Sequence, residues 1–282
     1  MILVAQVSDT HFDLGDRNAE RAARVMRFLS ALRHRPDAVI ITGDITDSGR
    51  PGQYAQAAAT LGLPTPSAGP SDIPLYFLPG NHDDRAAFRT GLLGEPAATT
   101  PINQVAWVGA PSATTGVTVA LLDSSIPGDS GGRLAPETYD WLREVLRGAP
   151  ADSPILLAMH HPPAPLFSPV VDVIALADPD RLAEVVGGDD RILGVLTGHA
   201  HSAAATTFAG KPMLAAPSTA SVLGGEWELE LPDHVMDYAP DPAIALHVIE
   251  NHRITTHFRS VPMNGRISVL PTEPQPHPTL HV

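Results

Sequence analysis

Short apolar runs recur along the chain, and five of them share one organisation. Each run spans four to six residues and is continuous rather than alternating, which is typical of strands that are buried on both faces of a sheet. The five runs are Ile2–Val7, Ala38–Ile41, Leu75–Leu78, Ile155–Met159 and Ile192–Leu196. We therefore predict five buried strands at these positions.

Helical patterns appear between several of these runs. Ala22, Val25 and Leu29 recur at the three-to-four-residue period of an amphipathic helix, and Pro136 suits the first turn of another helix. On such grounds, four segments are predicted to be helical: 20–33, 53–61, 136–147 and 181–186.

Other apolar segments predict further strands. These segments are 105–108, 117–122, 206–209, 213–215, 244–249 and 253–260. The first two look central to a sheet. The last two are separated by Glu250, Asn251 and His252, which is typical of a hairpin.

The order of these elements predicts an α/β fold. Strands alternate with helices early in the chain and dominate later, which favours a two-sheet β-sandwich flanked by helices, with αββα layers. We find no internal repeat and no convincing domain boundary, so residues 1–268 are predicted to form one domain. The proline-rich residues 269–282 predict a mobile tail, and the content of proline, serine and glycine predicts a loop at 64–74.

The composition limits the chemistry and the partners. The chain has no cysteine, which excludes disulfides, thiolate metal ligands and a cysteine nucleophile. Its net charge of −13 argues against a surface that binds nucleic acid. No apolar run reaches the roughly 18 residues of a membrane-spanning helix. The first residues, MILVAQVSD, lack the basic leader of a secretory signal, so we expect a cytoplasmic protein with no integral membrane segment.

Polar clusters follow each of the five apolar runs. The clusters are Asp9-Thr10-His11, Gly43-Asp44-Ile45-Thr46-Asp47, Gly80-Asn81-His82-Asp83, His160-His161-Pro162 and Gly198-His199-Ala200-His201. In open α/β sheets, ligands bind beyond the carboxyl ends of the strands. Five strands would therefore bring these side chains to one place, where histidine, carboxylate and amide groups could hold metal ions.

The spacing within the clusters supports a shared site. Asp9 and His11 are two residues apart, as are His199 and His201, and residues at this spacing in an extended chain point to the same side. Glycine precedes three of the clusters, at 43, 80 and 198, where a missing Cβ permits tight turns and close approach of the backbone.

Each cluster taken alone has an ordinary explanation. A single D-x-H after a strand is usually a turn, Asn-His-Asp suits many loops, and adjacent histidines can form a hydrogen-bonded core pair. Five such clusters in this order, each at a predicted strand end, are very hard to explain by coincidence, so we interpret them as a metal site. The other histidines are interpreted as surface or core residues, among them His34, His234, His247, His252, His257, His277 and His281.

With the motifs D-x-H, GD-x-x-D, GNH-D, H and GH-x-H in this order, the sequence resembles the calcineurin-like metallophosphoesterase superfamily over roughly residues 1–220. The stretches GNHDDR (80–85), LDSSIPG (122–128) and HHPP (160–163) look like the class III cyclic-nucleotide phosphodiesterases, a branch that also includes glycerophosphodiesterase relatives. The resemblance implies a binuclear metal-dependent phosphodiesterase.

The resemblance also implies which residues hold the two metal ions. The first ion would take Asp9, His11, Asp44 and His201, and the second would take Asp44, Asn81, His160 and His199, so that Asp44 bridges them. His160 is chosen over His161 by the family pattern, and neighbouring residues of a strand face opposite ways. Such mixed nitrogen and oxygen donors suit divalent or trivalent transition metals such as manganese, iron or zinc.

The implied reaction is the attack of a metal-activated hydroxide on phosphorus. His82 is expected to stay off the metals and to protonate the leaving-group oxygen. An oriented imidazolium needs an acceptor behind it. By resemblance Asp47 is the first candidate and Asp83 the alternative, while a purely loop-stabilising role for Asp47 stays open.

The leading hypothesis for the substrate is a 3′,5′-cyclic nucleotide, cAMP or cGMP, or a similar small phosphodiester. A glycerophosphodiesterase or a broad phosphomonoesterase would carry the same motifs, and the loops 125–135 and 161–177 are expected to decide between them. A non-catalytic scaffold would be expected to lose ligand residues, and none is lost. The apolar segment 162–176 suggests a cap over the site or the surface of a homodimer, and a packed loop is an equally good interpretation.

The proline-rich tail generates a first prediction. Removal of the residues after Leu270 is expected to leave the melting temperature and the turnover nearly unchanged, because a polar, proline-rich segment buries little apolar surface. Calorimetry and an activity assay on the truncated chain measure this. A large loss of either property would show that the tail docks on the domain.

Overall fold

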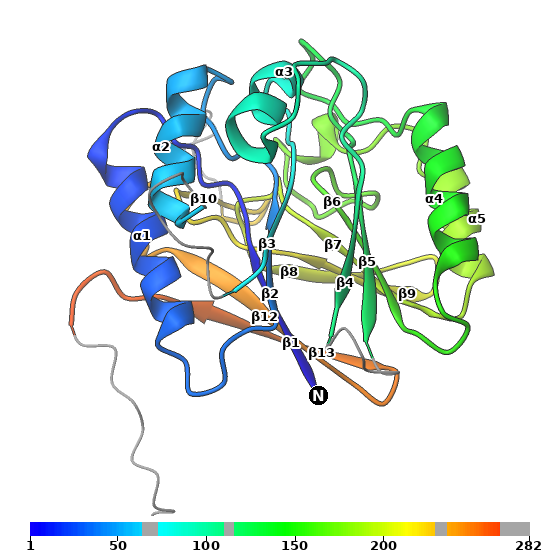
Figure 1. Cartoon of the computed structure of the whole chain (residues 1–282). Helices are drawn as coiled ribbons and strands as arrows, with labels where there is room; N and C mark the ends of the chain where they lie inside the picture. The colour runs from blue at the N-terminus through cyan, green and yellow to red at the C-terminus, as the bar shows by residue number, and fades with distance from the viewer. Residues whose placement is uncertain (64–72, 110–115, 229–235, 266–282) are drawn as a thin grey trace, which may run out of the picture.

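Two large sheets face one another, and helices lie on their outer sides (Figure 1). The computed structural model describes residues 1–63, 73–109, 116–228 and 236–265. The predicted tail at 269–282 and most of the predicted loop at 64–74 lie outside the described residues. The α/β two-sheet sandwich with flanking helices is the fold that the order of the elements predicts.

The first sheet has five strands in the order β13-β12-β1-β2-β3. The strands are β1 (Ile2–Val7), β2 (Ala38–Thr42), β3 (Leu75–Leu78), β12 (Ala243–Glu250) and β13 (Arg253–Ser260). β1, β2 and β3 are parallel, whereas β12 runs antiparallel to β1. The carboxyl ends of β1, β2 and β3 therefore lie at one edge of the sheet.

The second sheet has six strands in the order β4-β5-β6-β7-β9-β8. The strands are β4 (Gln104–Val108), β5 (Val117–Leu122), β6 (Ile155–Met159), β7 (Ile192–Thr197), β8 (Ala204–Phe208) and β9 (Lys211–Ala215). The four inner strands are parallel, and both outer strands are antiparallel to their neighbours. A separate short ladder joins β10 (Val222–Leu223) to β11 (Met236–Asp237).

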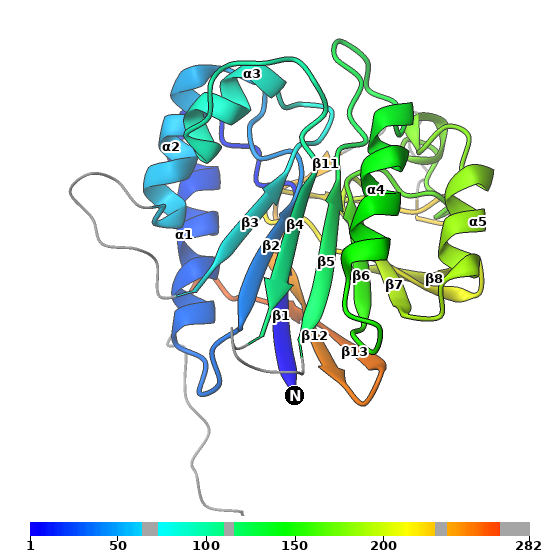
Figure 2. The same ribbon diagram turned by 45° about the vertical axis from the view of Figure 1, so that its right-hand side comes forward.

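Helices α1 (Asp16–Ser30) and α2 (Pro51–Leu61) cover the first sheet, and α4 (Pro136–Gly148) and α5 (Asp180–Gly188) cover the second (Figure 2). The described residues also include three short helical segments: α3 (Arg85–Phe88), the π-helix η1 (Arg89–Leu93) and the 3₁₀-helix η2 (Asp172–Ile174).

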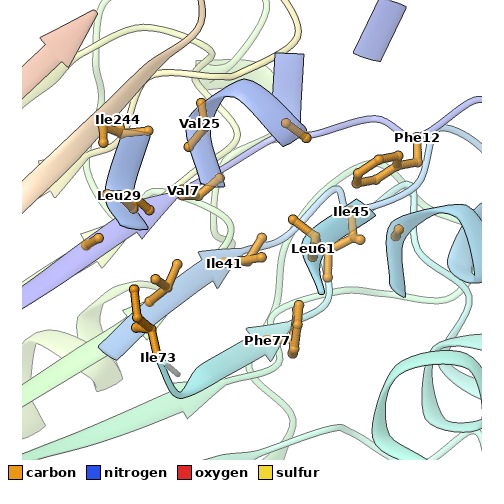
Figure 3. Close-up of a cluster of buried hydrophobic side chains, with 14 of the residues drawn as sticks. Val7, Phe12, Val25, Leu29, Ile41, Ile45, Leu61, Ile73, Phe77 and Ile244 are labelled. Carbon is orange, nitrogen blue, oxygen red and sulfur yellow. The ribbon is translucent and has the colours of Figure 1, made fainter. Parts of the chain in front are cut away.

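Each sheet packs an apolar layer against its helices. Val25 and Leu29 of α1 meet Val7 and Ile41 of the first sheet (Figure 3). On the other side of the molecule, Leu142 of α4 packs in a cluster with residues of the second sheet. The helical period predicted for the segment 20–33 is therefore confirmed by the face that α1 buries.

A third layer lies between the two sheets. Val4 and Ile40 of the first sheet meet Leu156 and Leu196 of the second. Because side chains alternate along a strand, Gln6 of β1 faces the same side as Val4. The layer is thus apolar over most of its length and becomes polar near the carboxyl ends of the strands.

Several predictions about single elements can be checked. All five buried strands are confirmed, and so is the hairpin, whose two-residue turn Asn251-His252 has φ of 50° and 56°. The prediction that the strand at 105–108 is central was wrong. β4 is an edge strand with Val105 54% exposed, and an apolar run does not specify its neighbours in a sheet. The elements α3, η1, η2, β10 and β11 were not predicted.

Within the described part of the chain, no helix combines the length and the apolar character that crossing a bilayer requires.

The outer apolar layers generate a prediction about stability. Replacement of the fully buried Leu142 by alanine is expected to lower the free energy of unfolding by about 2–5 kcal/mol, because a cavity remains where α4 meets the sheet. Denaturant unfolding measures the change. Val105→Ala, at an exposed edge position, is the control and should change it by less than about 0.5 kcal/mol. Equal effects of the two substitutions would contradict the assigned packing.

Candidate metal centre

The seven predicted ligand residues come together where the carboxyl ends of the two sheets meet. The first sheet supplies four of them, after β1, β2 and β3, and the second sheet supplies three, after β6 and β7. Six of the seven are buried, and Asn81 is half-buried. The full set is Asp9, His11, Asp44, Asn81, His160, His199 and His201.

The first group of donors consists of Asp9, His11, Asp44 and His201, whose ligand atoms all lie within 4.8 Å of one another. His201 Nε2 lies 3.1 Å from His11 Nε2 and 3.4 Å from Asp9 Oδ1. Ligand atoms held about 2.0–2.2 Å from one ion lie about 3.0–3.5 Å from each other. These separations therefore fit a single coordination sphere.

The second group of donors lies on the other side of Asp44. His160 Nε2 is 3.1 Å from Asn81 Oδ1 and also 3.1 Å from His199 Nδ1. The carboxylate of Asp44 stands between the groups, because its Oδ2 lies 3.3 Å from His160 Nε2 and 3.7 Å from His11 Nε2. The backbone N–H of His82 donates to the other oxygen of Asp44 at 2.9 Å, which fixes the carboxylate.

The outward nitrogens of two of these rings are held by acceptors. His160 Nδ1 donates to the Thr42 carbonyl at 2.8 Å, and His201 Nδ1 lies 2.9 Å from the hydroxyl of Ser221. Such bonds fix the orientation of an imidazole and direct its Nε2 to the site. The sequence does not indicate these two partners. Thr42 contributes its main-chain carbonyl, which any residue type could supply, and Ser221 stands at no characteristic spacing from the motifs.

His199 is oriented differently. Its buried Nε2 has no hydrogen-bond partner among the residues that the structure describes. The ring is held by packing, with centroid distances of 4.9 Å to His160 and 4.7 Å to His161. A ring fixed in this way directs its Nδ1 into the second group of donors, 3.1 Å from His160 Nε2.

The electrostatics of the groups centre on Asp44. Burial opposes its charge, but the adjacent His160 and His11 hold the pKa of Asp44 well below its usual range. Burial alone would lower the pKa of His160, and the neighbouring Asp44 raises this pKa to about 9. Burial lowers the pKa of His201 to about 4, against the attraction of Asp9. The protonated His160 therefore balances the buried carboxylate when no metal ion is present.

The donor set fits transition metals. Four imidazoles, two carboxylates and one amide oxygen converge, and they include no soft sulfur ligand. Imidazole and oxygen donors in this mixture suit zinc, iron or manganese. The close approach of so many donor atoms in a buried space is an arrangement that cations would stabilise.

His161 departs from the expectation that adjacent histidines face opposite ways. Its ring lies 4.9 Å from that of His160, and its ligand atoms come within 4.8 Å of those of His160 and His199. Both of its nitrogens are nevertheless engaged, Nδ1 with Ser124 Oγ at 2.8 Å and Nε2 with the Ser130 carbonyl at 3.2 Å. Burial and the neighbouring His160 charge lower the pKa of His161 to about 3. His161 is thus a neutral side chain whose nitrogens bond outside the donor groups, whereas His160 Nε2 lies among Asn81, His199 and Asp44.

The expectation of an extended backbone at the paired ligands was wrong. Asp9 and His11 have φ of 52° and 43°, and His199 and His201 have φ of 67° and 53°, all in the left-handed region. Asp44 joins them with φ of 47°. Left-handed backbone at residues other than glycine costs about 1–3 kcal/mol each and is concentrated at functional sites. The members of each pair converge because the chain turns sharply, rather than because it is extended.

Glycine is required beside these turns, as the sequence predicts. A Cβ on Gly43, which itself has φ of 88°, would lie 2.4 Å from His160 Nδ1. A Cβ on Gly80 would lie 2.2 Å from Asp44 Oδ1. Both distances are shorter than any tolerable contact, so a side chain at either position would displace a ligand residue.

His82 lies at the rim of the site, with its side chain 41% exposed. Its Nδ1 donates to the main-chain carbonyl of Asp47 at 2.7 Å, and its Nε2 lies 4.0 Å from Asp44 Oδ2. The acceptor behind the ring therefore belongs to Asp47, but it is the carbonyl and not the predicted carboxylate. The Asp47 carboxylate lies 3.6 Å from His11 Nδ1, and this contact lowers the pKa of Asp47.

Asp83, the alternative partner for His82, has a different place. Its carboxylate accepts the backbone N–H groups of Gly80, Ile45 and Thr46 at 3.0–3.1 Å, and the hydroxyl of Tyr54 at 3.0 Å. These bonds tie the loop after β3 to the loop after β2. Asp83 therefore fixes the backbone that carries Asp44 and Asn81.

The chain is similar to known phosphoesterases over most of its length. The profile of the calcineurin-like phosphoesterase family matches residues 2–203. A probable cyclic nucleotide phosphodiesterase of Rhodococcus erythropolis is 38% identical over 223 residues, which cover 77% of this chain and 70% of that protein. A glycerophosphodiester phosphodiesterase of Enterobacter lignolyticus is 33% identical over 231 residues, which cover 77% of each chain.

A solved structure shares the fold. The crystal structure of a dimetal phosphatase from Danio rerio superposes with a TM-score of 0.63, covering 92% of this chain and 96% of that one at 14% sequence identity. This similarity supports the arrangement of two main sheets and flanking helices.

The charge on His160 generates a prediction about metal binding. Since the pKa of His160 is raised to about 9, a cation must displace a proton at neutral pH, and binding of Mn²⁺ to metal-free protein is expected to release protons. The apparent affinity should rise as the pH rises from 6.5 towards about 9. The protonated ring stabilises the metal-free fold below pH 6.5, and this contribution is lost as the pH rises through about 9.

Calorimetric titration in buffers of different ionisation enthalpy counts the released protons. His160→Gln, which cannot carry the proton, is the control and should release fewer. Binding without proton release, at an affinity independent of pH, would contradict the assigned charge.

Proposed function

This chain belongs to the calcineurin-like phosphoesterase family, and from that premise we propose that it is a binuclear metal-dependent phosphodiesterase of 3′,5′-cyclic nucleotides or similar small diesters. The observation that carries the proposal is the position of Asp44. One of its oxygens lies within 3.7 Å of imidazoles from two separate donor groups, as a ligand shared by two ions would.

The proposed ligands follow the two groups. Asp9, His11, Asp44 and His201 would hold one ion, and Asp44, Asn81, His160 and His199 would hold the other. When bound, the two ions would supply a nucleophilic hydroxide near neutral pH and positive charge for the phosphoryl oxygens. The roles of the remaining residues follow from their positions around these groups.

His82 is the proposed general acid. Its Nδ1–H is held by the Asp47 carbonyl, which directs Nε2 to the side of the ring that approaches Asp44. Its partial exposure leaves Nε2 accessible to a substrate at the rim. From there it can donate a proton to the leaving oxygen, while the Asp47 carboxylate orients His11.

Two cavities flank His82 and support a diester substrate. One, of about 490 Å³, is lined near the donors by His11 and His201 and further out by Arg17 and Tyr238. The other, of about 190 Å³, lies beside Arg85 and Ser125. The guanidinium of Arg17 stacks 4.8 Å from the centroid of the Tyr238 ring. A flat base suits the larger, aromatic cavity, which favours a nucleotide substrate.

A glycerophosphodiester is the second candidate, because the relative from Enterobacter lignolyticus matches over the same share of the chain as the relative from Rhodococcus. The loops that were expected to discriminate are joined: the Gly132 carbonyl accepts from Ala177 N at 2.8 Å, and Gly132 N donates to the Ala175 carbonyl. Gly132 of the first loop also packs against the ring of His161, the first residue of the second loop.

Other parts of the proposal come from the sequence. They are the identity of the metals as manganese, iron or zinc, action in the cytoplasm, and a homodimer formed through the segment 162–176. In that segment Asp172 accepts the backbone N–H groups of Leu166 and Phe167, while the side chains of Phe167 and Val173 stay exposed. A scaffold without activity is disfavoured because every ligand residue and His82 are present.

A substrate panel tests the proposal. Metal-free protein is expected to be inactive, and added manganese should restore hydrolysis, because the donors alone provide no nucleophile. The panel compares cyclic AMP, cyclic GMP, 2′,3′-cyclic nucleotides, glycerophosphocholine and p-nitrophenyl esters. Preference for glycerophosphocholine would select the second candidate. Full turnover by protein that elemental analysis shows to be free of metal would refute a metallophosphodiesterase.

His82→Ala tests the general acid. The substitution is expected to slow hydrolysis of an alkyl or nucleoside ester by about 10²–10⁴-fold and that of a p-nitrophenyl ester much less, because nitrophenolate leaves without a proton. The metal content should stay near normal. His257→Ala, which removes an exposed histidine on β13, is the control. An equal loss on both esters, or loss of one ion, would show that His82 binds substrate or metal instead.

A further inference from the structure

A chain of hydrogen bonds crosses the interior beneath the candidate metal centre. It begins at Thr256 on β13 and passes through His247 on β12 and Gln6 on β1 to the ends of β2 and β7. His247 and Gln6 are both completely buried. The proposed function uses neither side chain.

The direction of every bond in this chain is determined. Gln6 Nε2 lies 2.9 Å from the Thr197 carbonyl, which can only accept, so the amide oxygen of Gln6 must face His247 at 3.0 Å. His247 therefore donates from Nε2. Because burial lowers the pKa of His247 to about 3, the ring is neutral, and its Nδ1 accepts from the Thr256 hydroxyl at 2.8 Å.

This chain of hydrogen bonds ends at β2 and β7, two strands of different sheets that are each followed by proposed ligand residues. Gln6 Nε2 donates to Thr42 Oγ1 at 3.0 Å as well as to the Thr197 carbonyl. Thr42 is the last residue of β2, and its carbonyl accepts from His160 Nδ1. Thr197 is the last residue of β7 and stands two residues before His199. One carboxamide thus joins the bases of two ligand-bearing turns across the space between the sheets.

Stability alone does not account for this arrangement. The layer around the chain is apolar, with Val4, Ile40, Leu196 and Ile249 buried in it. Replacement of buried polar groups by apolar groups of similar volume is often neutral or stabilising. The hydrogen bonds instead fix orientations. Each bond orients the next side chain, from Thr256 through His247 and Gln6 to the turns that carry the proposed ligand residues.

We propose that His247 is a positioning residue of the metal centre, which holds the Gln6 carboxamide in one orientation and thereby sets the ends of β2 and β7 so that His160 and His199 converge. The inference rests on the proposed function, since it takes these two histidines as metal ligands. His247 itself touches neither the donor groups nor the cavity beside them.

Metal affinity measures this role directly. Competition of metal-free protein with a chromophoric chelator for Mn²⁺ gives the dissociation constants. His247→Leu, which has no donor for Gln6, is expected to weaken at least one constant about tenfold, the lower range for residues that orient metal ligands. His247→Gln, whose amide nitrogen can take the place of Nε2, should restore the constant to within about threefold of wild type.

Two further comparisons separate positioning from general destabilisation. In a Gln6→Leu background, His247→Leu should weaken metal binding no further, because the two residues act in series. Ile249→Ala removes buried volume from the same face of β12 and should lower the melting temperature without weakening metal binding. Additive effects of the Gln6 and His247 substitutions would overturn the inference, as would equal weakening by Ile249→Ala.

Thr256, which is half-buried on the edge strand β13, allows a milder test in case His247→Leu does not fold. Thr256→Val removes the hydroxyl that holds His247 and should weaken metal binding at least roughly twofold, whereas Thr256→Ser should not. Identical constants for the two Thr256 variants would overturn the inference. A wild-type chain that binds no metal would refute the proposed function, whereas wild-type binding of two ions that is unchanged in His247→Leu would refute only the role of His247.

Discussion

The buried carboxylate of Asp44 is the constraint on which the rest of the site depends. It is 2% exposed, and a charge removed from water in this way needs compensating charge close by. Three imidazoles, of His11, His82 and His160, come within 4.0 Å of one of its oxygens. The strand ends around Asp44 bring these three rings to a single carboxylate, with which His11 and His160, but not His82, would share cations.

Meeting that requirement strains the backbone. Of the eleven non-glycine residues with left-handed φ in the described part of the chain, five are predicted ligands. The strain is held by features outside the donor set. Asp83 fixes the loops after β2 and β3, Gly43 and Gly80 leave room for neighbouring ligand residues, and the parallel strands hold their carboxyl ends at one edge. These contacts therefore hold the backbone at the points where the predicted ligand residues follow the strands.

Much of this could be predicted from the sequence, because buried parallel strands and their polar ends leave a direct pattern. The five strands and the convergence of the polar clusters after them followed from that pattern, whereas the choice of seven predicted ligand residues came from the family resemblance. Strand order did not, since β4 looks like an inner strand in the sequence and lies at an edge. The roles of main-chain groups could not be predicted from the sequence either. The carbonyl of Asp47 orients His82 where the carboxylate was expected, and the left-handed turns reach the geometry that an extended chain was expected to give. Gln6 lies within a run that was predicted to be one continuous buried strand, and His247 was grouped with the histidines that were interpreted as surface or core residues.

The division of the proposed ligand residues between two sheets would have a consequence for the protein in a cell. Neither sheet carries a complete set for either ion, so a bound ion would cross-link the two layers, and separation of the layers would require its release. Binding to the closed form alone would stabilise it in proportion to the logarithm of the free metal concentration. A chain starved of metal would open more often along the layer between the sheets and expose apolar surface to proteases. Metal supply would then set the abundance of the protein as well as its activity.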